Sequence, residues 1–404
     1  MTPGELLWVR VDHLMVHDGG LRQIAPRLAE LQLDVWDPSK VIVVNDHYVP
    51  ASTEKAAEAL AIARQWSAEN GIQRFYDGQG ISHTIVVEEG LVRPGELYVG
   101  GDSHTCTAGV LGCLAIGVGS TDILCALATG ELWVRVPPTI RFDLLGKRLS
   151  LGVSTKDLVL SAIKDHGMDG ALYKVVEFLG EGVAGLSMEE RSVLTNMCAE
   201  LGAKSGIFPP DSMTRAHFAS LGIEIETELQ SDTDATYDQV WEYDLGSIQP
   251  VVAAPSAVDN VIRADEAAEV RITQAYIGAC TGAKYEDLEM AAAVLRGHSV
   301  APGVRLLIAP ASRSALARAI ESGVASDLMS AGAHILSTGC GACPGIGSGV
   351  LGPTDVCIST TNRNFTGRMG SAEAQIYLGS PYTVAASALA GRIIDPRTVM
   401  ADAE

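Results

Sequence analysis

The feature that most constrains the fold is a repeated alternation of short apolar runs with helical patterns along the 404-residue chain. In VIVVNDHYVP, an apolar run ends in polar residues, and the Ala-rich helical pattern STEKAAEALAIARQWSAENG follows it. The same order recurs around LYVGGDSHTCTAGVLGCLAIGVG, TQAYIGACTGAKYEDLEMAAAVLRG and RLLIAPASRSALARAIESG. Repeated strand–helix units predict an α/β protein with mainly parallel sheets, whose ligand sites lie at the carboxyl ends of strands.

Chain length and two proline-containing segments predict the domain organisation. A chain of this size is expected to form about two to four domains. The segments RVPPTIRFDLLG, near Pro137, and QPVVAAPSAVDN, around Pro255, resemble boundaries between domains. We therefore predict three α/β/α domains, comprising residues 1–137, 138–255 and 256–404.

The charge balance excludes two classes of partner. The chain has 29 Lys and Arg residues against 49 Asp and Glu residues, giving a net charge of −20. Such a field repels nucleic acid and anionic membrane surfaces, so an anionic ligand must be held by local cations. No apolar run reaches the roughly 18 residues of a membrane span, and the start MTPGELLWVRVDH does not resemble a secretion signal. We expect a cytoplasmic protein that binds neither nucleic acid nor membrane.

The chain has eight cysteines. In a long chain without a secretion signal, cysteines are expected to bind metal or to be buried, because small secreted folds are the ones that need disulfides. Five of them stand singly among apolar or small residues and are interpreted as small hydrophobic side chains. These five are Cys106, Cys113, Cys125, Cys198 and Cys357.

The sharpest local motif is Cys340-Gly-Ala-Cys343 in a Gly-rich segment. Alone, this C-x-x-C pair is compatible with redox chemistry, zinc or an iron–sulfur cluster, although the contexts typical of a thioredoxin or a zinc site are missing. Cys280, in IGACTG at the end of an apolar run, is the candidate third thiol. Electron-transfer clusters normally use four cysteines, so a set of three would leave one iron open to substrate or water as a Lewis acid.

Aspartates and histidines recur together at or beyond the apolar runs, in a chain with only nine histidines. A single histidine is usually a structural residue, but this number of pairs exceeds that expectation. An adjacent carboxylate can fix the tautomer of an imidazole and tune its pKa for acid–base chemistry. The residues concerned are Asp12-His13, Asp46-His47, Asp102-Ser103-His104, His17 and His83.

Two arginines near the C-terminus form a candidate anion site. Arg363 and Arg368 lie in STTNRNFTGRMGS, a segment of small polar residues that is poor packing material. Guanidinium groups bind carboxylates through paired hydrogen bonds. On an acidic chain, this concentration of positive charge indicates a site for an anionic ligand.

Taken together, these motifs resemble those of the aconitase superfamily. The matching segments are GQGISH, GGDSHTCTAGVLGCLAIGVGSTD, VVEFLGEGV, TNMCAELGAKSGIFPPD, IGACTG, CGACPG and STTNRNFTGR, in the family's order over nearly the whole chain. The likeness is greatest to the large subunits of 3-isopropylmalate dehydratase and homoaconitase. The resemblance implies an aconitase-like fold of three domains, with a swivelling fourth domain on a separate subunit.

The resemblance also implies a cofactor and roles for individual residues. A [4Fe-4S] cluster with one labile iron would be bound by three cysteines, with an asparagine beside it. Histidines paired with carboxylates would handle protons, and further polar residues would bind substrate. The implied cluster residues are Cys280, Cys340, Cys343 and the neighbouring Asn362. The implied catalytic residues are Asp46 with His47, His83 with Glu177, and His104 with Asp102; the implied substrate-binding residues are His17, Ser103, Arg363 and Arg368.

Family members add water to a carbon–carbon double bond or remove it, and the isomerases do both in turn. The implied activity is therefore that of a hydro-lyase acting on a small hydroxy dicarboxylic acid, with 3-isopropylmalate of leucine biosynthesis, via isopropylmaleate, as first choice. The family's base is a serine in a Gly-Ser-Ser/Thr-Arg type loop, and no such loop occurs here; Ser312 to Ser314 instead precede a helical pattern. We expect a small subunit with the swivelling domain to supply this serine, and the isolated chain to be nearly inactive.

Several alternatives remain open. Within the enzyme class they are homoaconitase and hydratases of maleate, citraconate or dimethylmalate. A cluster-free RNA-binding regulator is disfavoured by the acidic charge, and a zinc or thiol-redox protein leaves the Asp/His pairs and arginines unexplained. Gly282, where the family commonly has Asn, and Pro344, beside the Cys pair, depart from the family pattern.

Overall fold

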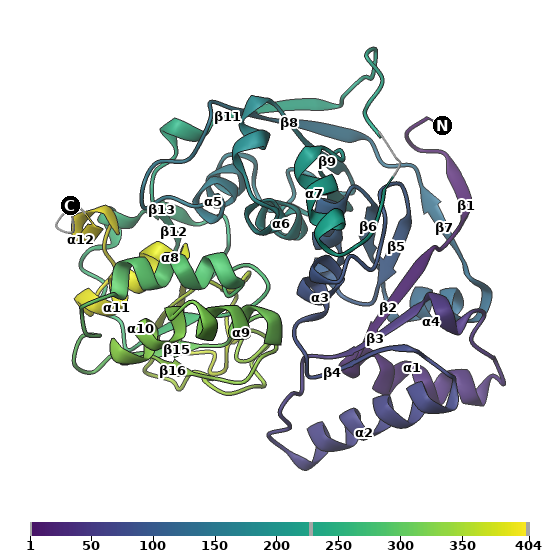
Figure 1. Cartoon of the computed structure of the whole chain (residues 1–404), viewed down its shortest axis with the longest axis horizontal. Coiled ribbons are helices and arrows are strands. Elements are labelled where there is room, and N and C mark those ends of the chain that lie inside the picture. The colour runs from purple at the N-terminus through teal and green to yellow at the C-terminus, as the bar shows by residue number, and fades with distance from the viewer. Residues whose placement is uncertain (1, 226–228, 401–404) are drawn as a thin grey trace. The chain divides into compact units, whose positions relative to one another are not determined.

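The computed structural model describes residues 2–225 and 229–400. The contacts within the chain divide it into two compact units. Figure 1 shows the chain coloured by residue number. Unit 1 comprises Met1–Lys147 and Asp169–Tyr243, and unit 2 comprises Arg148–Met168 and Asp244–Glu404. Each unit is described by itself.

A five-stranded parallel sheet is the centre of the first part of unit 1. Its strands follow the order β4-β3-β2-β5-β6. Helices α1, α2 and α4 pack on one face of this sheet through a shared apolar core (Figure 1). The strands are β2 (His13–His17), β3 (Val41–Asn45), β4 (Arg74–Asp77), β5 (Leu97–Gly100) and β6 (Leu114–Gly117). The helices are α1 (Asp18–Glu30), α2 (Glu54–Glu69), α3 (Ser82–Glu88), α4 (Ser120–Thr129) and the 3-10 helices η1 (Pro38–Lys40) and η2 (Ser103–Leu111).

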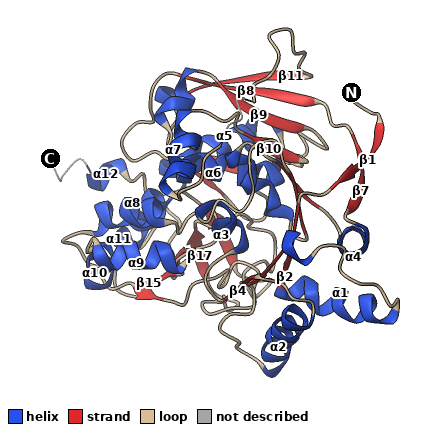
Figure 2. Cartoon of the chain, turned by 45° about the vertical axis from the view of Figure 1, so that its right-hand side comes forward, coloured by secondary structure: helices blue, strands red, loops and turns tan. Residues whose placement is uncertain are grey.

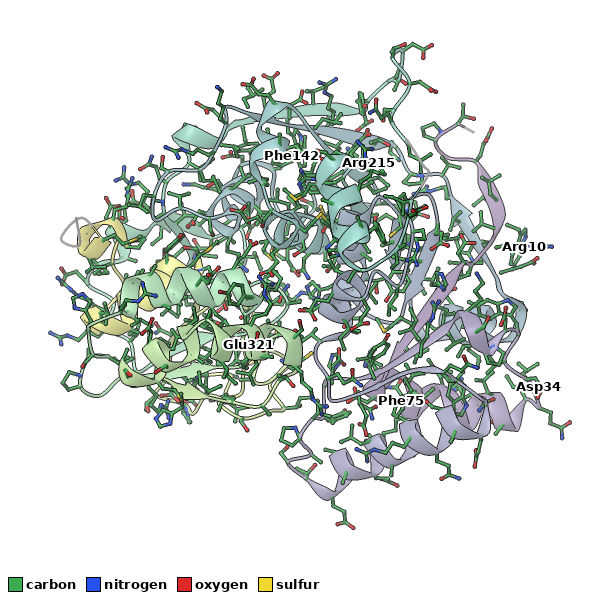
Figure 3. The ribbon with its side chains drawn as sticks, viewed as in Figure 1. Arg10, Asp34, Phe75, Phe142, Arg215 and Glu321 are labelled. Atoms are coloured by element: carbon green, nitrogen blue, oxygen red, sulfur yellow. The ribbon has the colours of Figure 1, made fainter. Side chains whose placement is uncertain are left out.

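Unit 1 has two further sheets. An antiparallel pair joins β1 to β7, and a four-stranded sheet follows the order β10-β9-β8-β11, with β8, β9 and β10 parallel. Phe142 on β8 lies in an aromatic core against Phe178 and Tyr243, with ring centroids 5.1 and 5.0 Å away (Figure 3). The strands are β1 (Leu6–Arg10), β7 (Glu131–Arg135), β8 (Thr139–Leu145), β9 (Val175–Leu179), β10 (Ser205–Ile207) and β11 (Gln239–Asp244). The helices are α6 (Met188–Met197), α7 (Ser212–Ser220), η3 (Glu181–Gly185) and η4 (Cys198–Leu201).

Unit 2 is built on a seven-stranded sheet in the order β13-β12-β18-β17-β14-β15-β16. The five strands from β18 to β16 are parallel, whereas β12 pairs antiparallel with β13 and β18. Helix α8 lies beside α9, α10 and α11, a group visible in Figure 2. The strands are β12 (Val251–Ala253), β13 (Val261–Arg263), β14 (Gln274–Ile277), β15 (Arg305–Ile308), β16 (His334–Ile335), β17 (Val356–Ser359) and β18 (Gln375–Leu378). The helices are α5 (Thr155–His166), α8 (Tyr285–Leu295), α9 (Arg313–Glu321), α10 (Val324–Ser330), α11 (Pro381–Ala390), α12 (Arg397–Met400), η5 (Leu245–Ser247) and η6 (Ala264–Ala267).

The predicted α/β class with mainly parallel sheets is confirmed. The expected strand–helix units are β3 with α2, β14 with α8, and β15 with α9, whereas β5 is followed by the 3-10 helix η2 rather than an α-helix. The division into three domains stays a prediction. Within residues 2–225 and 229–400, the structure has no helix long and apolar enough to cross a membrane.

Candidate functional site: an Asp/His cluster and a cysteine cluster

The centre of the candidate site in unit 1 is the Asp46–His47 pair, directly after β3. Asp46 is fully buried, and its Oδ1 lies 2.6 Å from Nδ1 of His47. Its Oδ2 accepts a hydrogen bond of 2.7 Å from the backbone N–H of Ser82 at the start of α3. Burial alone would raise the pKa of Asp46, but the charge and hydrogen bond of His47 outweigh it and lower the pKa to about 2. The pair is therefore a carboxylate that orients an imidazole.

A second pair, His17 and Asp18, lies where β2 passes into α1. The rings of His17 and His47 are stacked with centroids 4.3 Å apart. Asp18 is fully buried, and its Oδ2 accepts hydrogen bonds from the backbone N–H groups of His47 and Tyr48, at 3.2 and 2.9 Å. Asp18 thus fixes the backbone that carries His47. Parallel strands β2 and β3 are neighbours, so their carboxyl ends bring these residues together.

Asp102, at the end of β5, joins two more histidines. Its Oδ1 lies 2.9 Å from Nε2 of His83 and accepts a 2.7 Å hydrogen bond from the backbone N–H of His104. Nε2 of His104 lies 2.9 Å from Oε1 of Glu200. Burial opposes ionisation of Asp102, but His83 and His104 hold its pKa well below the ordinary value. Burial would lower the pKa of His104, yet its hydrogen bonds to Asp102 and Glu200 raise it.

These residues form what we name the Asp/His cluster. His47 Nε2 lies 3.9 Å from Asp102 Oδ2, which links the two halves of the cluster. Two groups of side chains have potential metal-ligand atoms within 4.8 Å of one another: His17, Asp18, Asp46 and His47 form one group, and His83, Asp102 and His104 form the other. The carboxylates accept hydrogen bonds from backbone N–H groups and imidazoles, so the arrangement is that of an acid–base network. The cluster comprises His17, Asp18, Asp46, His47, His83, Asp102, His104 and Glu200.

The predicted pairing of His83 with Glu177 is wrong. His83 Nε2 meets Asp102, and its buried Nδ1 has no hydrogen-bond partner among the described residues. The carboxylate of Glu177, on β9, accepts hydrogen bonds from the hydroxyl groups of Ser231 and Tyr237. The glutamate that meets the histidines is Glu200, which the sequence reasoning missed. The available signal was a charged residue inside the otherwise uncharged segment TNMCAELGA.

The Asp12–His13 pair lies elsewhere. His13 begins β2, so it is at the opposite end of this strand from the Asp/His cluster. Its Nδ1 contacts Arg74, at 3.1 Å, and its Nε2 lies 3.4 Å from Glu96. Because the pair lies at the start of β2, and because His13 contacts Arg74 and Glu96, we interpret the pair as structural.

In unit 2, the three candidate cluster cysteines lie in loops at the carboxyl end of the parallel sheet. Cys280 follows β14, and Asn362 follows the neighbouring strand β17. The thiols of Cys280 and Cys343 lie 3.8 and 4.0 Å from Oδ1 of Asn362, whose Nδ2 donates to the Cys280 sulfur at 3.6 Å. Cys280 and Cys343 are buried, and Cys340 is half-buried. We name Cys280, Cys340, Cys343 and Asn362 the cysteine cluster.

Two side chains support the Cys340–Cys343 loop. The hydroxyl group of buried Tyr276 accepts a 3.1 Å hydrogen bond from the backbone N–H of Ala342. Nη2 of Arg368 donates to the Cys343 sulfur at 3.8 Å, whereas its buried Nε has no hydrogen-bond partner among the described residues. The sequence analysis predicted Arg368 as an anion ligand but missed Tyr276.

The spacing of the sulfurs discriminates between kinds of metal site. A single zinc ion binds sulfur at about 2.3 Å and would hold its ligands within about 4 Å of one another. Among the described residues, the three cysteine sulfurs do not all lie within 4.8 Å of one another. A wider spacing between the sulfurs is expected for an iron–sulfur cluster, in which each cysteine binds a separate iron.

The structure explains why Gly282 stands where the family commonly has Asn. A Cβ atom at this position would lie 2.1 Å from Cβ of Thr360. Oγ1 of Thr360 accepts a 2.9 Å hydrogen bond from the backbone N–H of Gly278, and it donates to the carbonyl group of either Gly278 or Gly282, at 2.9 and 3.4 Å. Gly282 is therefore required by the close approach of the Cys280 loop to Thr360.

Of the remaining predicted residues, Ser103 is exposed at the start of η2, and Arg363 is half-buried directly after Asn362. Their substrate-binding roles stay predictions.

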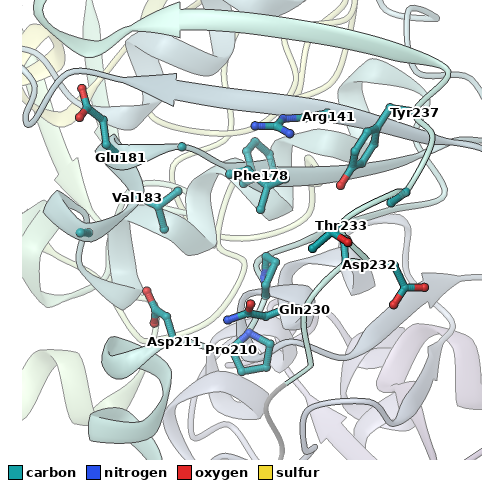
Figure 4. Close-up of a pocket in the computed structure, with 16 residues that line it drawn as sticks. Arg141, Phe178, Glu181, Val183, Pro210, Asp211, Gln230, Asp232, Thr233 and Tyr237 are labelled. Atoms are coloured by element: carbon teal, nitrogen blue, oxygen red, sulfur yellow. The ribbon is translucent and has the colours of Figure 1, made fainter.

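Unit 1 also has a pocket of about 570 Å³ that the predicted residues do not line (Figure 4). Phe178, Tyr237 and Arg141 lie on one side of it, and Asp211 and Gln230 lie on the other. Arg141 is paired with Asp143 outside this lining, and no described feature of the pocket matches the Asp/His or cysteine chemistry. We assign it no role.

Comparisons with known proteins identify the family and the fold. Residues 2–391 match the model of the Aconitase family (aconitate hydratase). The crystal structure of Thermococcus kodakaraensis aconitase X (holo-form) has a similar fold, with a TM-score of 0.54 and 15% identity over 91% of this chain and 89% of that one.

Similar curated proteins match over almost their whole length. The 3-isopropylmalate dehydratase large subunit 1 of Methanopyrus kandleri is 44% identical over 98% of this chain and 94% of its own. The corresponding large subunit of Aquifex aeolicus is 44% identical over 98% of this chain and 94% of its own. The probable methanogen homoaconitase large subunit of Methanosarcina mazei is 45% identical over 96% of this chain and 99% of its own. With a family model and full-length relatives in agreement, the chain belongs to the aconitase family.

Proposed function

We propose that the chain is the large subunit of an iron–sulfur hydro-lyase that isomerises 3-isopropylmalate by removing and re-adding water. The observation that carries this proposal is the identity of about 44% over nearly the whole chain to relatives named as large subunits of 3-isopropylmalate dehydratase. The aconitase-family fold and the two side-chain clusters support the reaction class.

The cysteine cluster would hold a [4Fe-4S] group through Cys280, Cys340 and Cys343. The fit rests on the contacts of Cys280 and Cys343 with Asn362 and on a sulfur spacing too wide for one zinc ion. When bound, the group supplies a Lewis acid for the departing hydroxyl group of the substrate. Asn362 would orient the sulfurs through its amide.

The Asp/His cluster would supply the proton that makes hydroxide a better leaving group. Asp46 holds Nδ1 of His47, so a proton on Nε2 is the one that His47 can give. Because the pKa of Asp46 is lowered to about 2, this aspartate stays charged and stabilises the imidazolium form. Asp102 would orient His83 in the same way.

Substrate carboxylates would bind to arginines. The buried Nε of Arg368 has no hydrogen-bond partner among the described residues, which supports an anion as its missing acceptor. Arg363, in the same segment, is the second candidate. His17 and Ser103 are proposed to contact the substrate as well.

A small subunit is proposed as the partner, because the relatives are named as large subunits. It would bring the base that removes a proton from carbon. The hydroxyl group of Ser312, the first serine of the only Ser-Arg-Ser sequence, caps α9 by accepting a 3.0 Å hydrogen bond from Ala315 N–H. This bond gives Ser312 a structural role at the start of α9, which supports the small subunit as the source of the base.

The test is anaerobic reconstitution with iron and sulfide, followed by hydration assays on isopropylmaleate, citraconate and maleate, with and without the cognate small subunit. We expect activity with isopropylmaleate only in the reconstituted pair. If the chain takes up no iron and sulfide and the pair hydrates none of these acids, the proposed function is wrong.

Homoaconitase is the second candidate. It is favoured by the 45% identity to the Methanosarcina mazei protein, which carries that name. Homoaconitate should be added to the assay panel, since a preference for it over isopropylmaleate would select this alternative.

A further inference from the structure

Lys156, near the start of α5 in unit 2, is almost completely buried. Only 1% of it is exposed, and it is among the largest fully buried side chains of the described residues. Burying an ammonium group costs several kcal/mol of desolvation unless hydrogen bonds and negative charge compensate it. A lysine in the first turn of a helix also meets the positive end of the helix dipole. Both costs call for an explanation.

The ammonium group of Lys156 joins two loops. Its Nζ donates to the carbonyl oxygens of Thr361 and Thr360, at 2.8 and 3.3 Å, and contacts Oγ1 of Thr281 at 3.4 Å. The hydroxyl group of Thr281 in turn donates to the carbonyl group of Thr360, at 2.9 Å. These contacts tie the loop after β14 to the loop after β17.

Each of these loops carries a member of the cysteine cluster. Thr281 directly follows Cys280, and Thr361 directly precedes Asn362. The Asn362 amide donates to the Cys280 sulfur at 3.6 Å. Lys156 therefore contacts the sequence neighbours of both Cys280 and Asn362.

The neighbouring Asp157 is engaged in other contacts. It accepts hydrogen bonds from the backbone N–H groups of Ser154 and Val251, at 2.9 and 3.1 Å. Burial, only partly offset by such bonds, raises its pKa to about 6. Negative charge on the thiolates of the cysteine cluster would help to compensate the buried ammonium group.

We propose that Lys156 is a positioning residue of the iron–sulfur site, which holds the Cys280 and Asn362 loops in register and supplies a fixed positive charge behind the thiolates. This inference rests on the cluster in the proposed function. Residues that hold metal ligands in place without binding the metal typically contribute roughly 10- to 100-fold in metal affinity.

The experiment compares Lys156→Met, which removes the ammonium group but keeps an unbranched side chain of similar length, with Lys284→Met as a matched control. Lys284 is also buried in unit 2, but its Nζ lies 2.7 Å from the carboxylate of Asp287, so its charge is already neutralised. The full chain is reconstituted anaerobically. The readouts are the rate of iron loss to a chelator, the reduction potential of the bound cluster and the thermal midpoint of the cluster-free chain.

We expect Lys156→Met to lose iron about tenfold faster and to have a more negative reduction potential, because a nearby positive charge favours the reduced cluster. Lys284→Met should lower the thermal midpoint without either change. Thr281→Val, which keeps Lys156 but removes the hydroxyl link, should speed iron loss by a smaller factor with little effect on the potential.

The outcomes separate this inference from the proposed function. If the wild-type chain takes up no cluster, the proposed function fails. If it takes up a cluster, and Lys156→Met matches it in iron loss and potential, Lys156 is only a core residue and the inference is overturned. Should Lys156→Met and Lys156→Gln both fail to fold, the ammonium group serves the folding of unit 2, which also overturns the assignment.

Discussion

At the residue scale, the Asp46–His47 pair leads to the first prediction. Asp46→Asn removes the charge that holds the imidazole of His47, so kcat of the reconstituted pair should fall by about 10²-fold or more. KM should change less, since Asp46 is buried and contacts His47 rather than the exterior. The measurement is steady-state hydration of isopropylmaleate.

Asp12→Asn is the matched control. Asp12 also precedes a histidine, but its Oδ2 accepts a 2.8 Å hydrogen bond from Leu97 N–H, which an asparagine oxygen can replace. Activity should stay near that of the wild type. Equal losses of kcat in both variants would show that the Asp46 effect is a general loss of folding.

The second prediction concerns His104 and pH. Its pKa is raised in the folded chain, so its protonation stabilises the fold fully below the ordinary value of 6.5, and this contribution is lost as pH rises through the folded pKa. Glu200→Gln removes one of the two carboxylates that raise it, so the pKa should fall. Chemical denaturation midpoints, measured above and below pH 6.5, should then vary less with pH, and NMR titration of the histidine ring should report the lower pKa.

Glu177→Gln provides the control for this titration. Its carboxylate binds Ser231 and Tyr237, so the pKa of His104 should not change. A shift of the His104 pKa in Glu177→Gln, but not in Glu200→Gln, would reverse the assignment of partners.

At the element scale, local patterns predicted the strand–helix units because each unit is contiguous in the sequence. β14 and α8 form from adjacent residues, and the parallel pairing of β14 with β17 then brings Cys280 close to Asn362. The 3-10 helix η2 was not predicted. Its tight packing is a tertiary effect, since a Cβ on Gly109 would lie 1.8 Å from the carbonyl oxygen of Gly206 on β10.

The third prediction tests another close approach, between two loops of unit 2. Gly282→Ala would place a Cβ 2.1 Å from Cβ of Thr360, so the Cys280 loop must shift, at a cost of about 1–3 kcal/mol in the free energy of unfolding. Thr360→Gly in the same chain should recover part of this loss of stability, which a double-mutant cycle by urea denaturation would measure.

Gly352→Ala is the control for this cycle. A Cβ there would meet its nearest atom, on Asp355, at 3.6 Å, which is ordinary contact, so little destabilisation is expected. Purely additive effects of Gly282→Ala and Thr360→Gly would contradict the proposed clash.

At the scale of the whole molecule, the contacts that the sequence could not predict are the ones between distant segments. His104 and Glu200 are 96 residues apart, and Lys156 and Thr361 are 205 apart. Glu200 lies in one of the family segments and Lys156 lies in none, but the partners of both are set by how sheets and helices pack. The resemblance to the aconitase family misassigned the glutamate partner for the same reason, and the catalytic roles of the histidines stay predictions.

The last prediction follows from the distribution of the chemistry over two units. The cysteine cluster lies in unit 2 and the Asp/His cluster in unit 1, so cluster uptake and proton transfer should be separable by mutation. Cys280→Ser should lose most of the iron and sulfide taken up on reconstitution while keeping the pH titration of His104. Asp46→Asn should keep the full iron content but have a low kcat. Cys125→Ser, at an exposed cysteine of unit 1, should retain both properties. Full iron uptake by Cys280→Ser would remove this residue from the ligand set, and iron loss in Asp46→Asn would mean that the two clusters depend on each other.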